Sequence, residues 1–270
     1  MQNRPVWSET FDRAADSYDS PVLRFFDINA AALARAVPLP SGAVILDVAT
    51  GTGKVAVAAA EAGGLRARVV GIDVSEQMLT RAQKRASGLP VEFRQMDARA
   101  LEFPSQTFDA VLCGHAISFF RPHLLSCVKQ MNRVLKSGGW IGFSTFDEHA
   151  FMPATRLLVQ RLNENRAGGS DSRKTRWMRL DRPRYVRRLL KEGHFSDHRV
   201  IRLKTTYPLE RVEDWWTYFW GSAWRGALGR LAESDLQLVR QGLLEDLGKL
   251  PPSEALQLNA TAHIGVGRRR

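Results

Sequence analysis

Between residues 43 and 145, short apolar runs alternate with longer stretches in which apolar residues recur every three or four positions. The short runs are rich in β-branched residues and predict buried strands, whereas the longer stretches predict amphipathic helices. The predicted strands are residues 43–48, 68–73, 91–95, 108–113 and 140–145, and the predicted helices are residues 54–62, 76–87 and 122–135. Strands that alternate with helices form right-handed βαβ units, so we expect a parallel sheet covered on both faces.

The segments on either side of this alternation have a different pattern. Residues 5–37 look helical, with a break at Ser20 and Pro21. The remaining predictions are helices over 147–180, 183–192 and 210–250, and strands over 198–207 and 256–266. We therefore expect one doubly wound α/β domain with a mostly parallel, seven-stranded sheet over residues 1–270. In this plan residues 1–40 form a helical lid, 41–146 the core, and 147–180 and 208–250 helical inserts over the substrate site.

The composition is that of an ordinary globular protein, with 44% hydrophobic and 25% charged residues. No apolar run reaches the roughly 18 residues that a membrane helix needs, and residues 1–19 lack the apolar core of a secretory signal. Cys113 and Cys127 sit in apolar stretches, and neither has the spacing of a metal site. We expect a cytoplasmic protein with two reduced thiols and no bound metal.

The net charge of +11 is unevenly distributed. Ten lysines and arginines lie between Arg166 and Lys191. Such a run is compatible with a solvated helix face, with an anionic substrate or with nucleic acid, and the sequence leaves these alternatives open.

The most specific chemical feature is the glycine loop of residues 47–53, between the first predicted strand and its helix. Glycines allow a tight turn and a close approach of the backbone to a ligand, and the helix N-terminus offers free N–H groups to an anion. Gly51, Gly53 and Ala56 also fit a dinucleotide-binding fingerprint, in which Asp73 would hold ribose hydroxyls. An NAD(P)-dependent oxidoreductase is therefore one alternative.

Two acids favour a different cofactor. Asp47 ends the first strand, where its carboxylate can face a cation, and the α-amino group of S-adenosylmethionine (SAM) supplies one that NAD lacks. Asp97 follows the third strand, where it can accept a hydrogen bond from an exocyclic amine. A tight glycine turn over residues 135–140 then leads into the fifth strand.

Taken together, these segments resemble the class I SAM-dependent methyltransferases, and most closely the group of small-molecule enzymes typified by ubiquinone and menaquinone biosynthesis. The matching pieces are residues 44–53, 71–79, 95–98, 108–111 and 133–139, and residues 11–19 resemble the opening motif of that group. The strong resemblance covers residues 44–145. Ala49 departs from the pattern, because many relatives have glycine there. The resemblance implies a Rossmann-like fold, SAM as cofactor and methyltransferase activity.

The resemblance also assigns residues to the cofactor. Asp47 would lie near the methionyl amino group, Asp73 would hold the ribose, and Asp97 would accept the adenine amine. Met78 would pack on the adenine, and Tyr18 would belong to the lid. The full cofactor set is Tyr18, Asp47, Ala49, Thr50, Gly51, Gly53, Asp73, Val74, Met78, Asp97, Ala98 and Cys113.

Catalytic candidates follow the fourth and fifth strands, because ligands in open α/β sheets bind outside the carboxyl ends of the strands. His115 is the first candidate, as a general base or as a group that orients the substrate. Its alternative role is only structural, through a hydrogen bond to the cofactor or backbone. His149 is the second candidate.

The acceptor is predicted to be a small organic molecule of quinone-like or specialised metabolism. The chain lacks an Asn/Asp-Pro-Pro-Tyr/Phe run and a Pro-Cys nucleophile, which are typical of nucleic-acid methyltransferases. Aromatic residues crowd segment 215–225, beside Arg225, and predict an apolar acceptor with an anionic or polar group. An RNA-directed methyltransferase and a SAM-binding protein with another reaction remain alternatives.

Overall fold

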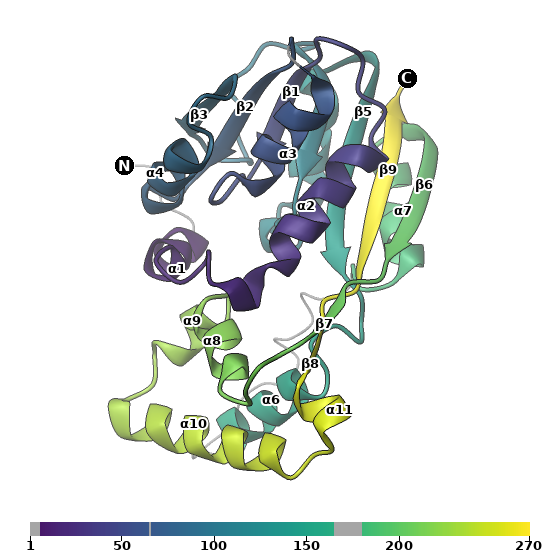
Figure 1. Ribbon diagram of the computed structural model, residues 1–270. Helices are drawn as coiled ribbons and strands as arrows, with labels where there is room; N and C mark the ends of the chain where they lie inside the picture. Colours follow the sequence, from purple (N-terminus) through teal and green to yellow (C-terminus); the bar gives the residue numbers. More distant parts are fainter. Residues whose placement is uncertain (1–5, 65, 165–179) are drawn as a thin grey trace.

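The computed structural model describes residues 6–64, 66–164 and 180–270. Its core is a seven-stranded sheet in the order β3-β2-β1-β4-β5-β9-β6 (Figure 1). The strands are β1 (Val44–Val48), β2 (Arg68–Asp73), β3 (Val91–Gln95), β4 (Phe108–Cys113), β5 (Leu135–Phe146), β6 (Phe195–Leu203) and β9 (Ala262–Arg269). The first five run parallel, and β9 lies antiparallel between β5 and β6. The predicted doubly wound, mostly parallel α/β fold is confirmed.

Helices cover both faces of this sheet because successive strand residues point to opposite sides. Ile45 packs in a cluster with α2 (Phe25–Ala36) and α3 (Lys54–Gly63). Its neighbour Leu46 packs in the opposite cluster with α5 (Leu124–Val134) and α7 (Pro183–Glu192). The remaining sheet helix, α4 (Glu76–Arg85), packs along β2 and β3.

A second apolar cluster lies beyond the carboxyl ends of the parallel strands, in the lower half of Figure 1. It is built from α6 (Ala154–Glu164), α8 (Asp214–Trp220), α9 (Arg225–Leu228), α10 (Glu233–Gly248), α11 (Pro252–Ala255) and the paired strands β7 (Thr206–Pro208) and β8 (Gln257–Asn259). Trp215 and Phe219 are fully buried in it. Part of the aromatic segment is therefore core, as an aromatic-rich helix usually is.

Two of the predicted strands are each divided between two sheets. The predicted strand 198–207 comprises the end of β6 and the beginning of β7, and the predicted strand 256–266 comprises β8 and most of β9. The chain leaves the main sheet near Thr205, whose carbonyl accepts a hydrogen bond from the N–H of Ala260. The predicted single strands were wrong here, because a continuous apolar pattern does not show where a chain changes its pairing partner.

The flanking helical segments are partly as predicted. The N-terminal segment forms α1 (Val6–Ala14) and, after the predicted break, the short 3-10 helix η1 (Pro21–Leu23) and α2. Residues 166–179 of the basic run lie outside the described residues. Its described cations, from Arg182 to Lys191, are exposed on α7, so this part of the run is a solvated helix face.

Over the described ranges, no helix is long and apolar enough to cross a membrane. The same ranges contain no cluster of three or more His, Cys, Asp or Glu side chains that could hold a metal ion.

Candidate active site

The glycine loop after β1 leaves room for a ligand on one side and packs tightly on the other. Gly51 and Gly53 have φ values of 54° and 82°, in the left-handed region that favours glycine. A Cβ at Gly53 would lie 3.1 Å from Ala82 Cβ, whereas a Cβ at Gly51 would meet nothing within 4 Å. The open side of the loop at Gly51 therefore faces a cavity. Ala49 shares the left-handed conformation, with φ of 55°.

Asp47 is a buried carboxylate with one unpartnered oxygen. Its Oδ2 accepts a hydrogen bond from Thr50 Oγ1 at 2.5 Å, while Oδ1 has no partner among the described residues. Burial raises the pKa of this carboxyl to about 7, although the Thr50 hydrogen bond opposes the shift. An uncompensated buried acid is costly, so the position suits a cationic group of a ligand.

Asp73 ends β2 and joins two loops. Its Oδ2 accepts from the Gly51 N–H and its Oδ1 from the Ser75 N–H, both at 2.9 Å. Burial raises its pKa, while the backbone hydrogen bonds hold it down. Each oxygen keeps a second lone pair, so the fixed carboxylate can also accept hydrogen bonds from ligand hydroxyls.

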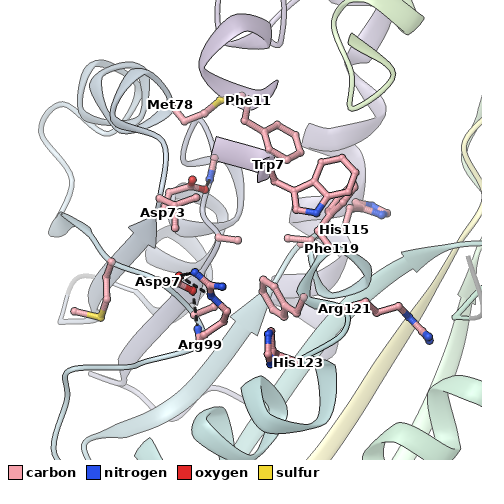
Figure 2. Close-up of a pocket in the computed structure, with 18 of the residues that line it drawn as sticks. Trp7, Phe11, Asp73, Met78, Asp97, Arg99, His115, Phe119, Arg121 and His123 are labelled. Atoms are coloured by element: carbon pink, nitrogen blue, oxygen red, sulfur yellow. Dashed lines mark hydrogen bonds and ion pairs between the residues drawn. The ribbon is translucent and has the colours of Figure 1, made fainter. Parts of the chain in front are cut away.

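The first cavity, of about 300 Å³, is lined by Asp73 and by Ala49 and Gly51 of the glycine loop, whereas Asp47 is fully buried and does not line it. Figure 2 shows Asp73 and Asp97 on one side of it, with the rings of Trp7 and Phe119 opposite. Its lining includes nine of the predicted site residues, namely Tyr18, Ala49, Gly51, Asp73, Val74, Met78, Asp97, Ala98 and His115. The sequence-predicted set is thus brought together from five separate segments of the chain.

Asp97 and Met78 both line this cavity, and they offer a ligand different kinds of contact. Both carboxylate oxygens of Asp97 accept hydrogen bonds from Arg99, from its N–H and its Nε, at 2.8 Å each. Met78 is almost fully buried in the first turn of α4, where the Ser75 hydroxyl caps its N–H. An apolar side chain and a hydrogen-bond acceptor are therefore available to one flat, amine-bearing group.

A second cavity, of about 140 Å³, lies between the end of β5 and the helices of the second apolar cluster. Nine aromatic side chains line it, among them Phe146, Phe151 and Tyr218. Four residues line both cavities: Phe11, Tyr18, His115 and Phe119. These four side chains form the junction at which a group could pass from one cavity to the other.

His115 is fixed at this junction by a buried hydrogen-bonded chain. Asn29 Nδ2 lies 3.0 Å from His115 Nε2, and Thr205 Oγ1 donates to Asn29 Oδ1 at 2.7 Å. The Ala260 carbonyl, 3.5 Å from the same Asn29 nitrogen, is consistent with this orientation of the amide. Because an amide nitrogen only donates, His115 Nε2 accepts, and the ring proton of the neutral imidazole resides on Nδ1.

This tautomer gives His115 one free hydrogen-bond donor. Nδ1 is buried and has no partner among the described residues, and the ring stacks on Phe146 at a centroid distance of 4.0 Å. Burial lowers the pKa of His115 to about 3. A neutral imidazole with such a low pKa is a poor proton acceptor near pH 7, so the geometry favours the orienting role over the general base.

The other predicted site residues lie outside the cavity walls. Thr50 lines a small extension beside the glycine loop. Asp47, Gly53 and Cys113 support the loop and sheet beneath it, and burial raises the pKa of the Cys113 thiol well above its usual value. The structure does not bring His149 to either cavity, because its side chain is exposed and its N–H is turned back to Asp147.

The N-terminal segment is fastened over the first cavity by polar contacts. Asp19 accepts from Thr52 Oγ1 at 3.0 Å and pairs with Arg85 at 2.6 Å. Ser75 Oγ donates to Asp12 at 2.5 Å. The Tyr18 ring stacks on Phe26, and burial beside Asp73 raises the pKa of its hydroxyl. The N-terminal segment, which the sequence predicts to be a lid, therefore contacts the loops that follow β1 and β2.

Sequence reasoning missed several residues of the site. Asn29 and Thr205 hold His115, and Trp7, Arg99 and Asp181 line the cavities. Asn29 had a visible signal, since it is a polar residue on the apolar face of the alanine-rich segment before residue 37. Thr205 and Asp181 had none, because only the fold brings them near β4 and β5.

The comparisons with known proteins agree with this geometry. Residues 45–139 match the family model described as a methyltransferase domain. Residues 45–139 thus form a methyltransferase domain of the class I SAM-dependent type. The matched segment runs from β1 to the beginning of β5 and contains the glycine loop, Asp47, Asp73 and Asp97. Of these, Asp47 and Asp97 are the features that favour SAM over the cofactor of an oxidoreductase.

The curated relatives are similar to this methyltransferase domain over part of their length. A demethylmenaquinone methyltransferase of Bacillus licheniformis is 39% identical over 104 residues, which cover 38% of this chain and 44% of the relative. The chain thus matches about half of the length of that relative.

Solved structures share the fold. A putative methyltransferase from Bacillus halodurans aligns with a TM-score of 0.59 at 21% identity, covering 90% of this chain and 99% of the other. A phosphoethanolamine N-methyltransferase of Haemonchus contortus, solved with S-adenosylhomocysteine, aligns with a TM-score of 0.60 at 18% identity, covering 98% and 59%. At these identities the likeness concerns the fold alone.

The residues present fit SAM, the cofactor of this class. The unpartnered Oδ1 of Asp47 suits an ammonium group, the Asp73 carboxylate suits ribose hydroxyls, and the open face of Gly51 leaves space for the backbone to approach a ligand.

Proposed function

We propose that this protein transfers the methyl group of SAM to a small organic acceptor bound in the second cavity. The observation that carries the proposal is the junction of the two cavities, where Phe11, Tyr18, His115 and Phe119 line both. In an in-line displacement the acceptor atom and the transferred methyl must meet on one line. Two cavities that share a wall provide that meeting point.

Asp47, in the loop support, and the residues that line the first cavity would have separate tasks in holding the cofactor. Asp47 pairs with the amino group, Asp73 accepts from the ribose, and Asp97 and Met78 take the adenine edge and face. SAM supplies an electrophilic methyl group on a sulfonium ion. Because this group is already activated, the protein's own contribution is alignment and the exclusion of water.

The junction residues provide this alignment. The rings of Phe11, Phe119 and Tyr18 exclude water from the path between the cavities. His115 presents its Nδ1–H as a fixed donor that orients a polar atom of the acceptor and leaves the attacking lone pair free. It does this without a change of protonation, since its pKa of about 3 keeps it neutral.

The size of the second cavity supports a small acceptor over a nucleic acid. Its volume of about 140 Å³ is below that of a typical drug-sized ligand site, and its walls are mainly aromatic. A nucleic-acid substrate would instead need a surface of cations that contact phosphates over several nucleotides.

The test is a methyl-transfer assay with isotope-labelled SAM. It offers a panel of small apolar acceptors beside tRNA and duplex DNA. We expect label in small molecules only, and the double substitution Phe119→Ala/His115→Ala should abolish it while SAM still binds. Label in nucleic acid alone would overturn the small-molecule proposal. SAM binding without transfer to either panel would favour the alternative of a SAM-binding protein with another reaction.

A further inference from the structure

The charged side chains that line the second cavity are acids, although the chain as a whole carries a net charge of +11. They are Asp147 and Glu148, directly after β5, and Asp181, directly before α7. No lysine or arginine appears among the lining residues in the described part of the chain. This contrasts with the anionic group that the arginine-rich sequence predicts for the acceptor.

These acids are held in place by the backbone. Thr145 Oγ1 donates to the Leu180 carbonyl at 2.8 Å, and the Glu148 N–H donates to the Asp181 carbonyl at 3.1 Å. His263 Nε2 lies 3.2 Å from that same carbonyl and 3.2 Å from Asp147 Oδ2. Since both of these oxygens are acceptors, one ring N–H of His263 ties the two segments together.

Two of the three acids have cationic partners, and the third has none. Arg182 pairs with Glu148 at 2.5 Å, and Arg202 lies 3.4 Å from Asp147. Among the described residues, no ion pair reaches the carboxylate of Asp181, and the hydrogen bond that it accepts is from its own backbone N–H. Burial and the nearby charges of Glu148 and Asp147 raise the pKa of Asp181, and Arg182 only partly offsets them.

The remainder of the lining is suited to a cation as well. Aromatic rings present a negative face that attracts ammonium groups, and this cavity is lined by nine of them. The three acids line the same cavity as these rings.

We infer that the acceptor is an amine with an apolar body, which enters the second cavity as an ammonium cation and is recognised by the carboxylate of Asp181. Before transfer the ammonium gives one proton to this carboxylate, and the freed nitrogen lone pair then forms the bond to the methyl carbon as the bond from that carbon to the sulfur of SAM breaks. This inference rests on the proposed function, because it concerns the second substrate of that site. The apolar body packs among the aromatic rings, and the ammonium compensates the one acid that the described residues leave unpaired. A carboxylate-bearing acceptor would instead bring a fourth negative charge to the same cavity.

The experiment measures binding to the complex with S-adenosylhomocysteine by calorimetry. The probes share one body and differ in one group: 2-phenylethylamine, 2-phenylethanol and 3-phenylpropionate, with 1,4-naphthohydroquinone as a larger neutral phenol. We expect the amine to bind at least about tenfold more tightly than the alcohol or the carboxylate. The same panel is then offered with labelled SAM, and we expect the amine to be the preferred acceptor.

The variant Asp181→Asn should weaken amine binding about tenfold or more and leave alcohol binding within about twofold. Glu192→Gln is the matched control, since it removes an exposed acid paired with Arg188 at the other end of α7, and it should leave the amine preference intact. Unchanged binding of S-adenosylhomocysteine shows that each variant is folded.

Three results would overturn the inference. They are equal or tighter binding of the alcohol, phenol or carboxylate, an amine affinity that Asp181→Asn does not change, and a complex with S-adenosylhomocysteine that binds no amine. Each of them leaves the proposed function standing if labelled methyl groups reach another small acceptor. Loss of SAM and S-adenosylhomocysteine binding in the wild type would instead count against the proposed function itself.

Discussion

Asn29 holds the Nε2 atom of His115 as a hydrogen-bond acceptor, at a distance of 3.0 Å between the amide nitrogen and the ring nitrogen. Asn29 lies on α2 and His115 follows β4. One buried contact therefore links the last helix of the N-terminal segment to the junction of the two cavities. The contact determines which ring nitrogen carries the proton, and thereby what His115 can do.

Replacing this partner should change turnover more than cofactor binding. We expect Asn29→Leu to lower kcat about tenfold or more, since His115 loses its fixed orientation and a buried nitrogen loses its partner. The dissociation constant for SAM should change by less than threefold or so, because Asn29 lines neither cavity. Thr205→Ser keeps the hydroxyl that supports Asn29 and serves as the control. An equal loss in SAM affinity and kcat would show that Thr205, Asn29 and His115 have a general structural role.

The variant Asn29→Asp should reverse the ring tautomer. A carboxylate accepts from Nε2–H, which moves the ring proton and raises the pKa of His115 from about 3. We expect the rate to become dependent on pH between about 5 and 8, where the wild type is flat with respect to this group. The measurement is kcat against pH for both proteins, and identical profiles would contradict the assigned tautomer.

The affinity for SAM should depend on the charge of Asp47. Its pKa of about 7 in the ligand-free protein means that a cationic partner must compete with a proton below that value. We expect SAM affinity to fall as the pH drops from about 8 to 6, and Asp47→Asn to bind SAM about 10- to 100-fold more weakly without that dependence. Calorimetry at several pH values measures both, and a wild type with no pH dependence would argue against the Asp47 contact.

Asp47 also affects stability in the absence of ligand, with the opposite sign. Its pKa in the folded protein lies above the unfolded value near 3.8, so the folded state binds more protons between these values. The free energy of unfolding should therefore decrease as the pH rises from about 4 to 7 on account of this group. Asp47→Asn should flatten this part of the stability profile in urea denaturation, and saturating SAM should reduce the wild-type loss.

Substitutions at Ala49 test how much stability the protein loses by having alanine in place of glycine in this loop. Its φ of 55° is unfavourable for a residue with a Cβ, so Ala49→Gly should keep SAM binding and change stability by no more than about 1 kcal/mol, as relief of strain offsets the added freedom of the unfolded chain. Ala49→Val should destabilise the protein by more than 1 kcal/mol or so, since β-branched residues tolerate this region least. Thermal denaturation distinguishes the two, and a harmless valine would contradict the loop geometry.

Much of the cofactor site could be predicted because its residues lie within about 50 positions and follow a repeated pattern. Each predicted strand of the 43–145 alternation ends in a loop, and the carboxyl ends of parallel strands meet at one edge. That rule alone places Asp47, Asp73 and Asp97 near one another. The glycine loop adds the direction from which a ligand can approach.

The acceptor cavity could not be predicted in the same way, because its walls come from distant parts of the chain. Phe26, Phe146, Asp181 and Tyr218 have no common motif, and each has an ordinary alternative place in a core or on a surface. The basic run between Arg166 and Lys191 left an anionic substrate open as one alternative, but the charged side chains that line the second cavity among the described residues are carboxylates. Composition does not tell which side of a helix faces a cavity.

The role of His115 shows a related limit. Its place after β4 predicted a position at the carboxyl edge of the sheet, and His115 lines both cavities there. The protonation of its ring depends on Asn29, 86 positions earlier in the chain, and on the burial of the ring. The local sequence shows neither of these. Position could therefore be predicted, whereas the chemical state of the ring required the three-dimensional contacts.

The most direct test of the account is calorimetric titration of the wild type and Asp73→Ala with SAM, S-adenosylhomocysteine and NADH. We expect the wild type to bind both sulfur compounds and not NADH, because Asp47, Asp73 and the Gly51 loop together fit an amino acid joined to a nucleoside. Asp73→Ala should weaken SAM by about 1–3 kcal/mol, since two ribose hydroxyls lose a charged partner. Binding of NADH with no binding of SAM would contradict the central claim that the first cavity is a SAM site.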